Sequence, residues 1–274
     1  MSFISVFDVL GPNMIGPSSS HTAGAALIAH LAHKLIPAPL KRADFTLYGS
    51  FARTYRGHGT DRALLGGMLG FTPDDLRIRD SFEIARQRGL EYSFSPNETE
   101  TDLHPNTVDI RMENAAGQVM SVRGESLGGG KVRIVAINGV PVDFSGEYAA
   151  VIAIHQDKPG VVAHITKVLS DRGVNIAFMR LSREAKGDTA YSIIESDGAL
   201  PEGIPEQLRT NPYIHDVDVY KRQSECRIDP LRGHKPKFPV SCWTPFVVGS
   251  ATGRAYAVYL HSHRQPVLIR CADC

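Results

Sequence analysis

The stretch GPNMIGPSSSHTAGA, residues 11–25, decides how the first half of the chain is organised. It passes from a loop rich in glycine and proline, through three serines, into a segment with helical spacing. The first N–H groups of a helix have no partner inside it, and the helix dipole makes that end partly positive. The sequence therefore predicts a serine-capped helix N-terminus in this stretch.

Hydroxyl and imidazole groups crowd the predicted helix start. A helix needs only one side chain as its N-cap, whereas five residues with polar side chains follow one another here: Ser18, Ser19, Ser20, His21 and Thr22. Backbone N–H groups and hydroxyl donors at a helix N-terminus form a binding site for a carboxylate or a phosphate. An ordinary cap with spare serines is the alternative, and the number of donors favours the anion site.

The segment after this motif has helical spacing. Four apolar residues at intervals of four predict a helix over residues 22–36 with one buried face: Ala23, Leu27, Leu31 and Leu35. Pro37 and Pro39 end this helix because proline lacks the backbone N–H group that a helix needs. His30 and His33 favour a partly exposed helix face over a metal pair, because no acidic residue stands at helical spacing from them.

A second unusual stretch, GSFARTYRGHGTD at residues 49–61, places His58 between two glycines. The glycines leave the imidazole unshielded, and imidazole titrates near neutral pH, as suits a general base. An exposed turn is the alternative, and spacing alone does not decide between the two. Thr60 or Asp61 is expected to cap the following helix, which the glycine pair at 66–67 weakens.

A third motif, GGGK at residues 128–131, precedes an apolar strand at 132–137. Backbone amides of a glycine run can face a ligand, and Lys131 can supply a countercharge to an anion. Taken alone, the run is better explained as a flexible hairpin loop.

Composition excludes several classes of protein. The 274 residues carry a net charge of +1 and contain no long apolar run, so neither nucleic acid nor a membrane is expected as a partner. The N-terminus lacks the basic and apolar segments of a secretory signal, and we expect a cytoplasmic protein. Residues 1–225 contain no cysteine, so no cysteine-held metal site is predicted there.

The character of the sequence changes near residue 146. Apolar strands are predicted at 148–155, 174–182, 189–195 and 213–220, with helices at 161–172 and 205–210. The order β-α-β-β-α-β within about 70 residues is that of a ferredoxin-like unit. The chain is therefore expected to be an α+β protein with two folded parts.

Several motifs together resemble one family, the beta (small) chain of iron–sulfur-dependent bacterial L-serine dehydratase. The matching pieces are SVFD at 5–8, GPSSSHTAG at 16–24, YGSFA at 48–52, TYRGHGTD at 54–61, HPNT at 104–107 and GGGK at 128–131. The ferredoxin-like unit resembles an ACT domain, with DKPG at 157–160 as its first turn. The resemblance covers about residues 1–220 and departs from the family at Arg56, where a lysine is frequent.

The resemblance implies both a fold and an activity. Residues 1–146 would form the serine dehydratase beta-chain domain, a mixed sheet with helices, and residues 147–220 the ACT domain. The family converts L-serine to pyruvate and ammonia, using a [4Fe-4S] cluster with one open iron position as a Lewis acid. The cluster cysteines would belong to the partner alpha chain, which agrees with the cysteine-free first 225 residues.

The resemblance also implies roles for individual residues. His58 would remove the α-proton of serine, with Thr60 orienting it, and the Ser18–Thr22 run would hold the substrate carboxylate or line its approach. Lys131 is expected to bind the substrate as the countercharge beside the glycine run. In the ACT domain, Gly160 and Asn175 would hold an allosteric ligand, with serine itself as the activator. The alternative for the ACT domain is that it only makes the chain self-associate.

The last part of the chain, residues 221–274, fits neither pattern. Its periodicity fails, the family resemblance stops, and VYKRQ at 219–223 looks like a translated sequencing-adaptor scar, so we expect an irregular and non-native tail. All four cysteines lie here, and a cluster is disfavoured because only Cys271 and Cys274 have the spacing of ligands.

A second hypothesis makes the chain a serine-sensing regulatory module of another enzyme, without lyase activity. Its first half also resembles the allosteric substrate-binding domain of some phosphoglycerate dehydrogenases. The lyase subunit is favoured because the sequence has no glycine-rich fingerprint of a dinucleotide-binding domain.

Overall fold

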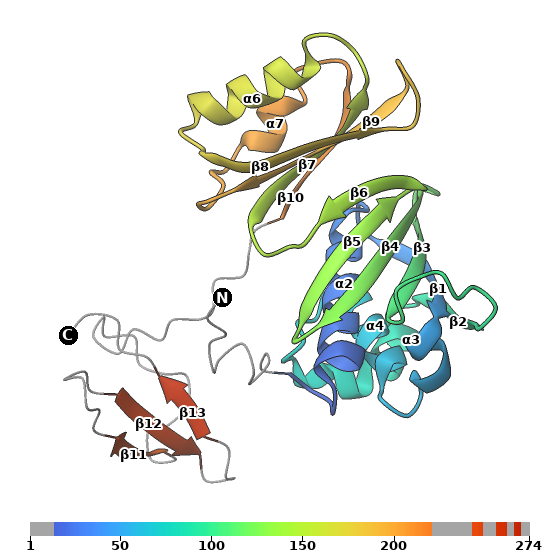
Figure 1. Cartoon of the computed structure of the whole chain (residues 1–274), viewed down its shortest axis with the longest axis vertical. Helices are drawn as coiled ribbons and strands as arrows, with labels where there is room; N and C mark the ends of the chain where they lie inside the picture. The colour runs from blue at the N-terminus through green and yellow to red at the C-terminus, as the bar shows by residue number, and fades with distance from the viewer. Residues whose placement is uncertain (1–13, 221–242, 249–255, 262–265, 270–274) are drawn as a thin grey trace. The chain divides into compact units, whose positions relative to one another are not determined.

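The computed structural model describes residues 14–220, 243–248, 256–261 and 266–269 (Figure 1). The SVFD motif and all four cysteines lie outside the described residues. The chain divides into two compact units, Met1–Arg222 and Gln223–Cys274. The first unit contains two sheets, one of six strands and one of four.

The six-stranded sheet has the order β2-β1-β3-β4-β5-β6. Strands β1 and β2 are parallel and the other neighbours are antiparallel, which confirms the expected mixed sheet. The bounds are β1 Leu40–Tyr48, β2 Glu91–Asn97, β3 Thr107–Asn114, β4 Val119–Gly128, β5 Lys131–Ile137 and β6 Val140–Phe144.

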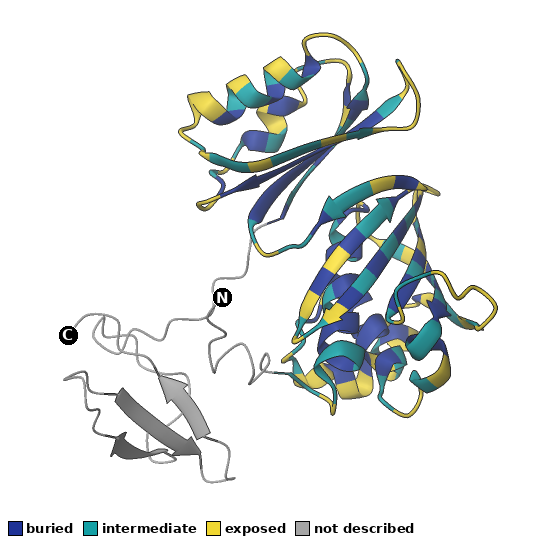
Figure 2. Cartoon of the chain, viewed as in Figure 1, coloured by how far each residue is buried: buried dark blue, intermediate teal, exposed yellow. Residues whose placement is uncertain are grey.

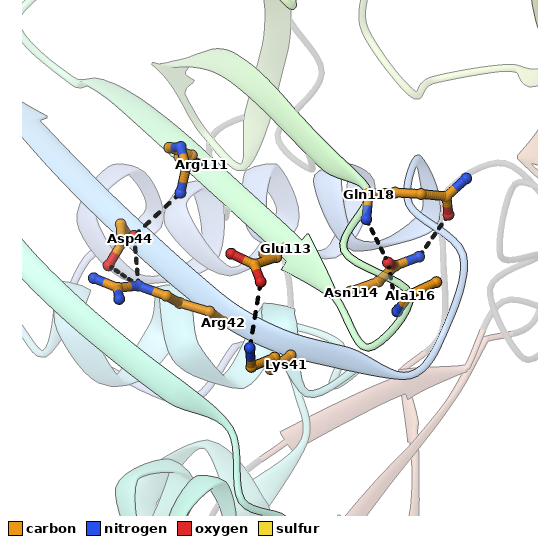
Figure 3. A network of polar contacts seen from close by, with 8 residues as sticks. All are labelled: Lys41, Arg42, Asp44, Arg111, Glu113, Asn114, Ala116 and Gln118. Atoms are coloured by element: carbon orange, nitrogen blue, oxygen red, sulfur yellow. Dashed lines mark hydrogen bonds and ion pairs between the residues drawn. The ribbon is translucent and has the colours of Figure 1, made fainter.

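Alternating burial along these strands gives the sheet an inner and an outer face (Figure 2). Phe45, Ile110 and Val122 are buried on the inner face, in one core with the helices that cover it. The outer face is polar, and Figure 3 shows part of it, where Asp44 lies between Arg42 and Arg111. The sheet thus follows the period of two expected for strands buried on one side.

The inner face is covered by short helices. Their bounds are η1 Ser19–Gly24, a π-helical turn, α2 Ala25–Lys34, α3 Gly49–Thr54, α4 Thr60–Met68, the 3-10 turn η2 Leu76–Asp80 and α5 Ser81–Gln87. Helices α2 and α4 pack closely, since a Cβ added at Gly67 would lie 2.3 Å from the Ala26 carbonyl oxygen. Gly67 therefore permits the helix contact, whereas the weakening of α4 by the glycine pair stays a prediction.

The predicted helix over residues 22–36 is divided in the structure into the π-helical turn η1 and the α-helix α2. The α-helix ends at Lys34, before Pro37, as the prolines predict. The expected partly exposed face is wrong for His30, which is only 7% exposed, and burial lowers its pKa to about 4. The Nδ1 atom of His33 lies 2.6 Å from the Met68 carbonyl oxygen, so this ring joins α2 to the end of α4.

The second sheet confirms the ferredoxin-like unit. Its elements are β7 Ala149–Gln156, α6 Val161–Asp171, β8 Ile176–Arg183, β9 Thr189–Ser196, α7 Ile204–Leu208 and β10 Ile214–Tyr220. The strand order is β10-β7-β9-β8, and every neighbouring pair is antiparallel. Helices α6 and α7 share a core with one face of this sheet. Residues of its other face, among them Ile152, Ile193 and Tyr220, belong to the same core as the six-stranded sheet and its helices. We call the six-stranded sheet with its helices the first lobe, and the ferredoxin-like unit the second lobe.

The second unit contains three strands, β11 Trp243–Val248, β12 Tyr256–His261 and β13 Pro266–Ile269, paired antiparallel in chain order. The sequence analysis expects an irregular tail, whereas these three segments form strands. That residues 221–274 are non-native stays a prediction.

Candidate functional site

The serine-rich motif forms the helix start that the sequence predicts. Ser18 is the N-cap residue, and its Oγ accepts a hydrogen bond from the His21 N–H at 3.0 Å. The backbone carbonyl of Ser18 accepts from the N–H groups of Thr22 and Ala23, at 2.9 and 3.3 Å. Ser19, Ser20 and the ring of His21 remain half-buried, and Thr22 is buried.

Two glycines bring neighbouring segments close to this helix start. A Cβ added at Gly24 would lie 2.1 Å from the Oγ of Ser126, which donates to the carbonyl oxygen of Ser20 at 3.0 Å. A Cβ at Gly16, whose φ is +133°, would lie 2.4 Å from the Thr22 side chain. Strand β4 and the preceding loop can therefore approach η1 because these positions lack side chains.

His21 joins three of the motifs. Its Nε2 lies 2.9 Å from the Ser50 Oγ, in the YGSFA motif, and its Nδ1 lies 3.4 Å from the Ser18 Oγ. The Ser50 N–H donates to the carbonyl oxygen of Pro105, in the HPNT motif, at 2.6 Å. Gly49 takes a φ of +52°, which permits this close approach to Pro105.

His58 lies against His21. The two ring centroids are 4.9 Å apart, with an angle of 32° between the ring planes, and the Thr22 Oγ1 donates to the His58 carbonyl oxygen at 3.1 Å. The structure thus places the GHG loop and the serine-rich motif side by side. The expectation of an unshielded imidazole is wrong, because His21 covers part of the ring and Nδ1 is buried without a partner among the described residues.

Thr60 is the first residue of α4, and its N-cap is Gly59 in the left-handed conformation, so neither Thr60 nor Asp61 is the cap. Its N–H donates to the Tyr55 carbonyl oxygen at 2.8 Å, which closes the loop that carries His58. The Thr60 side chain is fully buried, and its Oγ1 has no partner among the described residues. Buried polar atoms without partners are rare in folded proteins, and a catalytic role or a bound water or ion are among their explanations.

Lys131 is the exposed first residue of β5. The glycine turn before it lies near the serine-rich motif, since a Cβ at Gly128 would stand 3.9 Å from the Ser20 Oγ. The GGGK turn therefore lies next to the helix start that carries Ser20.

Three further residues of the site are absent from the sequence-based set. Ser50 contacts the His21 ring, and Ser126 contacts the Ser20 carbonyl oxygen. The Nδ2 of Asn106 donates to the Ser126 carbonyl oxygen at 3.3 Å, and its Oδ1 is buried with no partner in the described part of the chain. Each lies in or beside a quoted motif, but only the folded chain shows that they meet.

The charge state of His21 follows from its surroundings. Burial, and then the nearby His58, lower the pKa of His21 below its usual value. Because the usual value is already near 6.5, His21 is neutral at pH 7. A neutral imidazole next to two hydroxyl groups has a hydrogen-bonding partner at each nitrogen.

The candidate allosteric residues are not brought together within one chain. Gly160 caps α6 at its N-terminus with a φ of +89°, whereas Asn175 follows the other end of this helix of 11 residues. Such a helix is roughly 16 Å long. The exposed Asn175 donates from Nδ2 to the Asp197 Oδ2 at 2.5 Å. A ligand that contacts both positions would need a second copy of the chain.

No part of the described chain fits an iron–sulfur cluster. Such clusters need cysteine thiolates, and the cysteines fall outside the described residues. Those residues also contain no group of three or more His, Cys, Asp and Glu side chains that could hold a metal ion. Among the described helices, none is long and apolar enough to cross a membrane.

A hollow of about 470 Å³ lies apart from this site, on the outer face of the six-stranded sheet. It is lined by Asp109 and Arg123, which form a two-point ion pair at 2.6 and 2.7 Å, and by Asp44 and Arg111. Because its charges already pair with one another, we assign it no ligand.

The fold and the site together define the class of protein: a serine dehydratase beta-chain domain followed by an ACT domain. The family model described as serine dehydratase beta chain matches residues 5–135, and the ACT domain model matches residues 149–211. The chain belongs to the serine dehydratase beta-chain family.

Individual relatives agree with this assignment. The chain is 41% identical to the L-serine dehydratase beta chain of Peptoniphilus asaccharolyticus over 208 residues, which cover 76% of this chain and 94% of that protein. It is 40% identical to the probable L-serine dehydratase beta chain of Bacillus subtilis, over 79% of this chain and 98% of the relative. A D-3-phosphoglycerate dehydrogenase of Bacillus subtilis is 26% identical, over 71% of this chain and 37% of that enzyme.

Proposed function

We propose that this chain is the beta subunit of an L-serine dehydratase that converts L-serine to pyruvate and ammonia together with an alpha chain. The observation that carries the proposal is the contact of the His58 ring, at 4.9 Å, with His21 in the donor-rich helix start. A carboxylate-binding helix N-terminus beside a candidate base is what removal of a proton next to a carboxylate requires. The family assignment names serine as the substrate.

The residues of this chain bind the substrate and remove its α-proton. Ser19, Ser20 and the N–H groups at the start of η1 hold the substrate carboxylate, with Lys131 at its edge. A ring nitrogen of His58 takes the proton from the α-carbon, and the Thr60 N–H, bonded to Tyr55, keeps the loop of His58 closed. Loss of the hydroxyl group then leaves aminoacrylate, whose imine form is hydrolysed to pyruvate and ammonia.

The departure of the hydroxyl group is assigned to the partner chain. The described residues offer no ligand set for a metal or a cluster. We therefore propose that the [4Fe-4S] cluster is carried by the alpha chain, as the family resemblance implies.

The substitution His58→Ala tests the proposed base. In the enzyme assembled with its alpha chain, we expect at least about a 100-fold loss of turnover, because a positioned base contributes roughly 100- to 10,000-fold. The visible absorbance of the cluster should not change. His215→Ala, an exposed histidine of β10, is the matched control. Near-normal turnover of the His58 variant would contradict the assignment.

We also propose that the ACT domain binds L-serine as a regulatory ligand, between two copies of the chain. The separation of Gly160 and Asn175 along α6 supports a site shared by two chains. Calorimetric titration of the chain with L-serine, and of an Asn175→Ala variant, would measure this binding. If the unchanged chain and the Asn175→Ala variant bind L-serine equally, the ACT domain does not bind it through Asn175 and self-association is its remaining role.

A second candidate is a serine-sensing module of another enzyme, with no lyase activity. The observation in its favour is the 26% identity to a D-3-phosphoglycerate dehydrogenase over 71% of this chain. The two candidates differ in one measurement. A lyase subunit gives pyruvate from L-serine when it is combined with its alpha chain, whereas a sensing module only binds serine.

A further inference from the structure

The two histidines of the site differ in what their ring nitrogens contact. Both nitrogens of His21 face hydroxyl groups, Nε2 that of Ser50 at 2.9 Å and Nδ1 that of Ser18 at 3.4 Å. No side-chain hydrogen bond from the described residues reaches the buried Nδ1 of His58. Both ring nitrogens of His21 are therefore engaged by this chain, whereas the Nδ1 of His58 is engaged by none of the described residues.

The ring of His21 is also fixed by its aromatic neighbours. Phe51 meets it edge to face, with centroids 5.3 Å apart and planes at 70°, and His58 lies against it at 4.9 Å and 32°. Contacts of this geometry are favourable for aromatic rings. Rotation of the His21 ring would break both hydroxyl contacts and move the surface on which His58 rests.

Ser50 itself is held by the backbone around it. Its N–H donates to the Pro105 carbonyl oxygen at 2.6 Å, and its carbonyl oxygen accepts from the Thr54 Oγ1 at 2.7 Å. Gly49 has no side chain that would separate Ser50 from the Pro105 loop, where a Cβ would stand 2.7 Å from the carbonyl oxygen. Ser50 is thus a rigid partner for the His21 ring.

The charge of His21 also argues against a role in binding the substrate carboxylate. The pKa of His21 is lowered by burial and by His58, so the ring is uncharged at neutral pH. An uncharged ring with both nitrogens engaged offers little to a carboxylate, for which the hydroxyl and N–H groups of Ser19 and Ser20 remain.

We propose that His21, held by Ser50, is a positioning residue that orients the His58 ring, and that it does not bind the substrate carboxylate. The inference rests on the proposed function for the role of His58. The sequence analysis places His21 among the residues that bind the substrate, and this proposal revises that role. It also makes Ser50 a residue that supports the site, through its hydrogen bond to His21.

Kinetics of the assembled enzyme test this role. Ser50→Ala frees the His21 ring, and we expect kcat to fall about 10- to 100-fold, because small misplacements of reacting groups cost rates of this order. The KM for L-serine should stay within about twofold, since only geometry in the transition state is lost. His21→Phe, which keeps a flat ring against His58, should lose less kcat than His21→Ala.

The matched control is Ser93→Ala. Ser93 also donates a side-chain hydrogen bond, to the Asp44 Oδ1 at 2.6 Å, but on the outer face of the sheet. Its variant should keep both kcat and KM. If the Ser50 and His21 variants instead raise KM and leave kcat unchanged, His21 binds substrate and the proposal is overturned.

A second measurement does not depend on activity. In the chain labelled with ¹⁵N at histidine, the His21 nitrogens should give the NMR signals of one fixed neutral tautomer at pH 7. Ser50→Ala should replace them by averaged signals of both tautomers, and unchanged signals would overturn the proposed hold on the ring. An inactive wild-type complex that nevertheless shows the fixed tautomer would contradict the proposed function alone.

Discussion

At the scale of single residues, Gly67 shows how strongly one missing side chain determines the fold. A Cβ there would lie 2.3 Å from the Ala26 carbonyl oxygen and 2.7 Å from the Ala29 Cβ, so helices α2 and α4 would have to separate. We expect Gly67→Ala to lower the free energy of unfolding by roughly 1–3 kcal/mol, as overpacking does. Denaturant unfolding measures this change. Gly198→Ala, where nothing lies within 4 Å, is the control and should be nearly neutral.

Asp218, on β10, links stability to pH. Burial, and next the charge of Asp216, raise the pKa of its carboxyl group to about 7. The folded chain therefore binds this proton more tightly than the unfolded chain, so stability falls as pH rises from about 4 to about 7. We expect Asp218→Asn to raise the free energy of unfolding at pH 8 by roughly 1–3 kcal/mol and to have no such effect at pH 4.

Unfolding curves at the two pH values measure this difference. The exposed Asp102→Asn is the control, and at each pH its curve should match that of the unchanged chain, with the same difference between the two pH values. If the Asp218 variant gains the same stability at pH 4 as at pH 8, its carboxyl group is not the source of the pH dependence.

The residues also show where prediction from sequence ends. The capping role of Ser18 could be predicted because a cap is a local hydrogen bond. The contacts of Ser50 and Ser126 could not, because they join residues 29 and 106 positions apart in the chain. No local pattern encodes a contact between a helix start and a strand that follows so much later.

At the scale of elements, the spacing of apolar residues and the residues typical of turns predict the strands better than they predict where helices begin. The alternation of apolar residues located the strands around Phe45 and Ile110, and the β-α-β-β-α-β order of the second lobe is confirmed. The division of the first helix into η1 and α2 could not be predicted. Gly24, the last residue of the π-helical turn, lies against Ser126, a tertiary contact that no local pattern indicates.

Strand β8 is an edge of the four-stranded sheet and exposes two large apolar side chains, Phe178 and Leu181, at 46% and 48%. Unpaired edge strands with apolar side chains favour association. We expect the chain to self-associate through this edge and Phe178→Glu to shift the assembly toward monomers, as sedimentation velocity would show. Val119→Glu, equally exposed at 47% on β4, should leave the association unchanged. A monomeric wild-type chain would contradict this use of the ACT domain.

At the scale of the first unit, Arg180 is one of the side chains that connect the two lobes. Arg180 of β8 contacts the Asp143 Oδ2 of β6 at 3.2 Å and the Glu195 Oε2 of β9 at 3.3 Å. Glu195 is only 3% exposed, and burial raises its pKa. Removing Arg180 would leave the buried Glu195 without its ion partner, whereas Asp143 is half exposed. The two lobes are therefore joined by apolar packing, by the ion pair of Arg180 with Asp143, and by the hydrogen bond that the Asn138 Nδ2 donates to the Tyr191 hydroxyl at 3.2 Å.

The division of the chain at residue 222 leads to a prediction about the second unit. The serine dehydratase match ends at residue 135 and the ACT match at residue 211, and the compact first unit ends at Arg222. If residues 223–274 are non-native, a chain ended after Arg222 should unfold at the same midpoint and give the same turnover with its alpha chain. Tyr220 must be kept, because it belongs to the core of the first unit and contacts Phe144. Loss of assembly or of turnover in the shortened chain would show instead that these residues are part of the working enzyme.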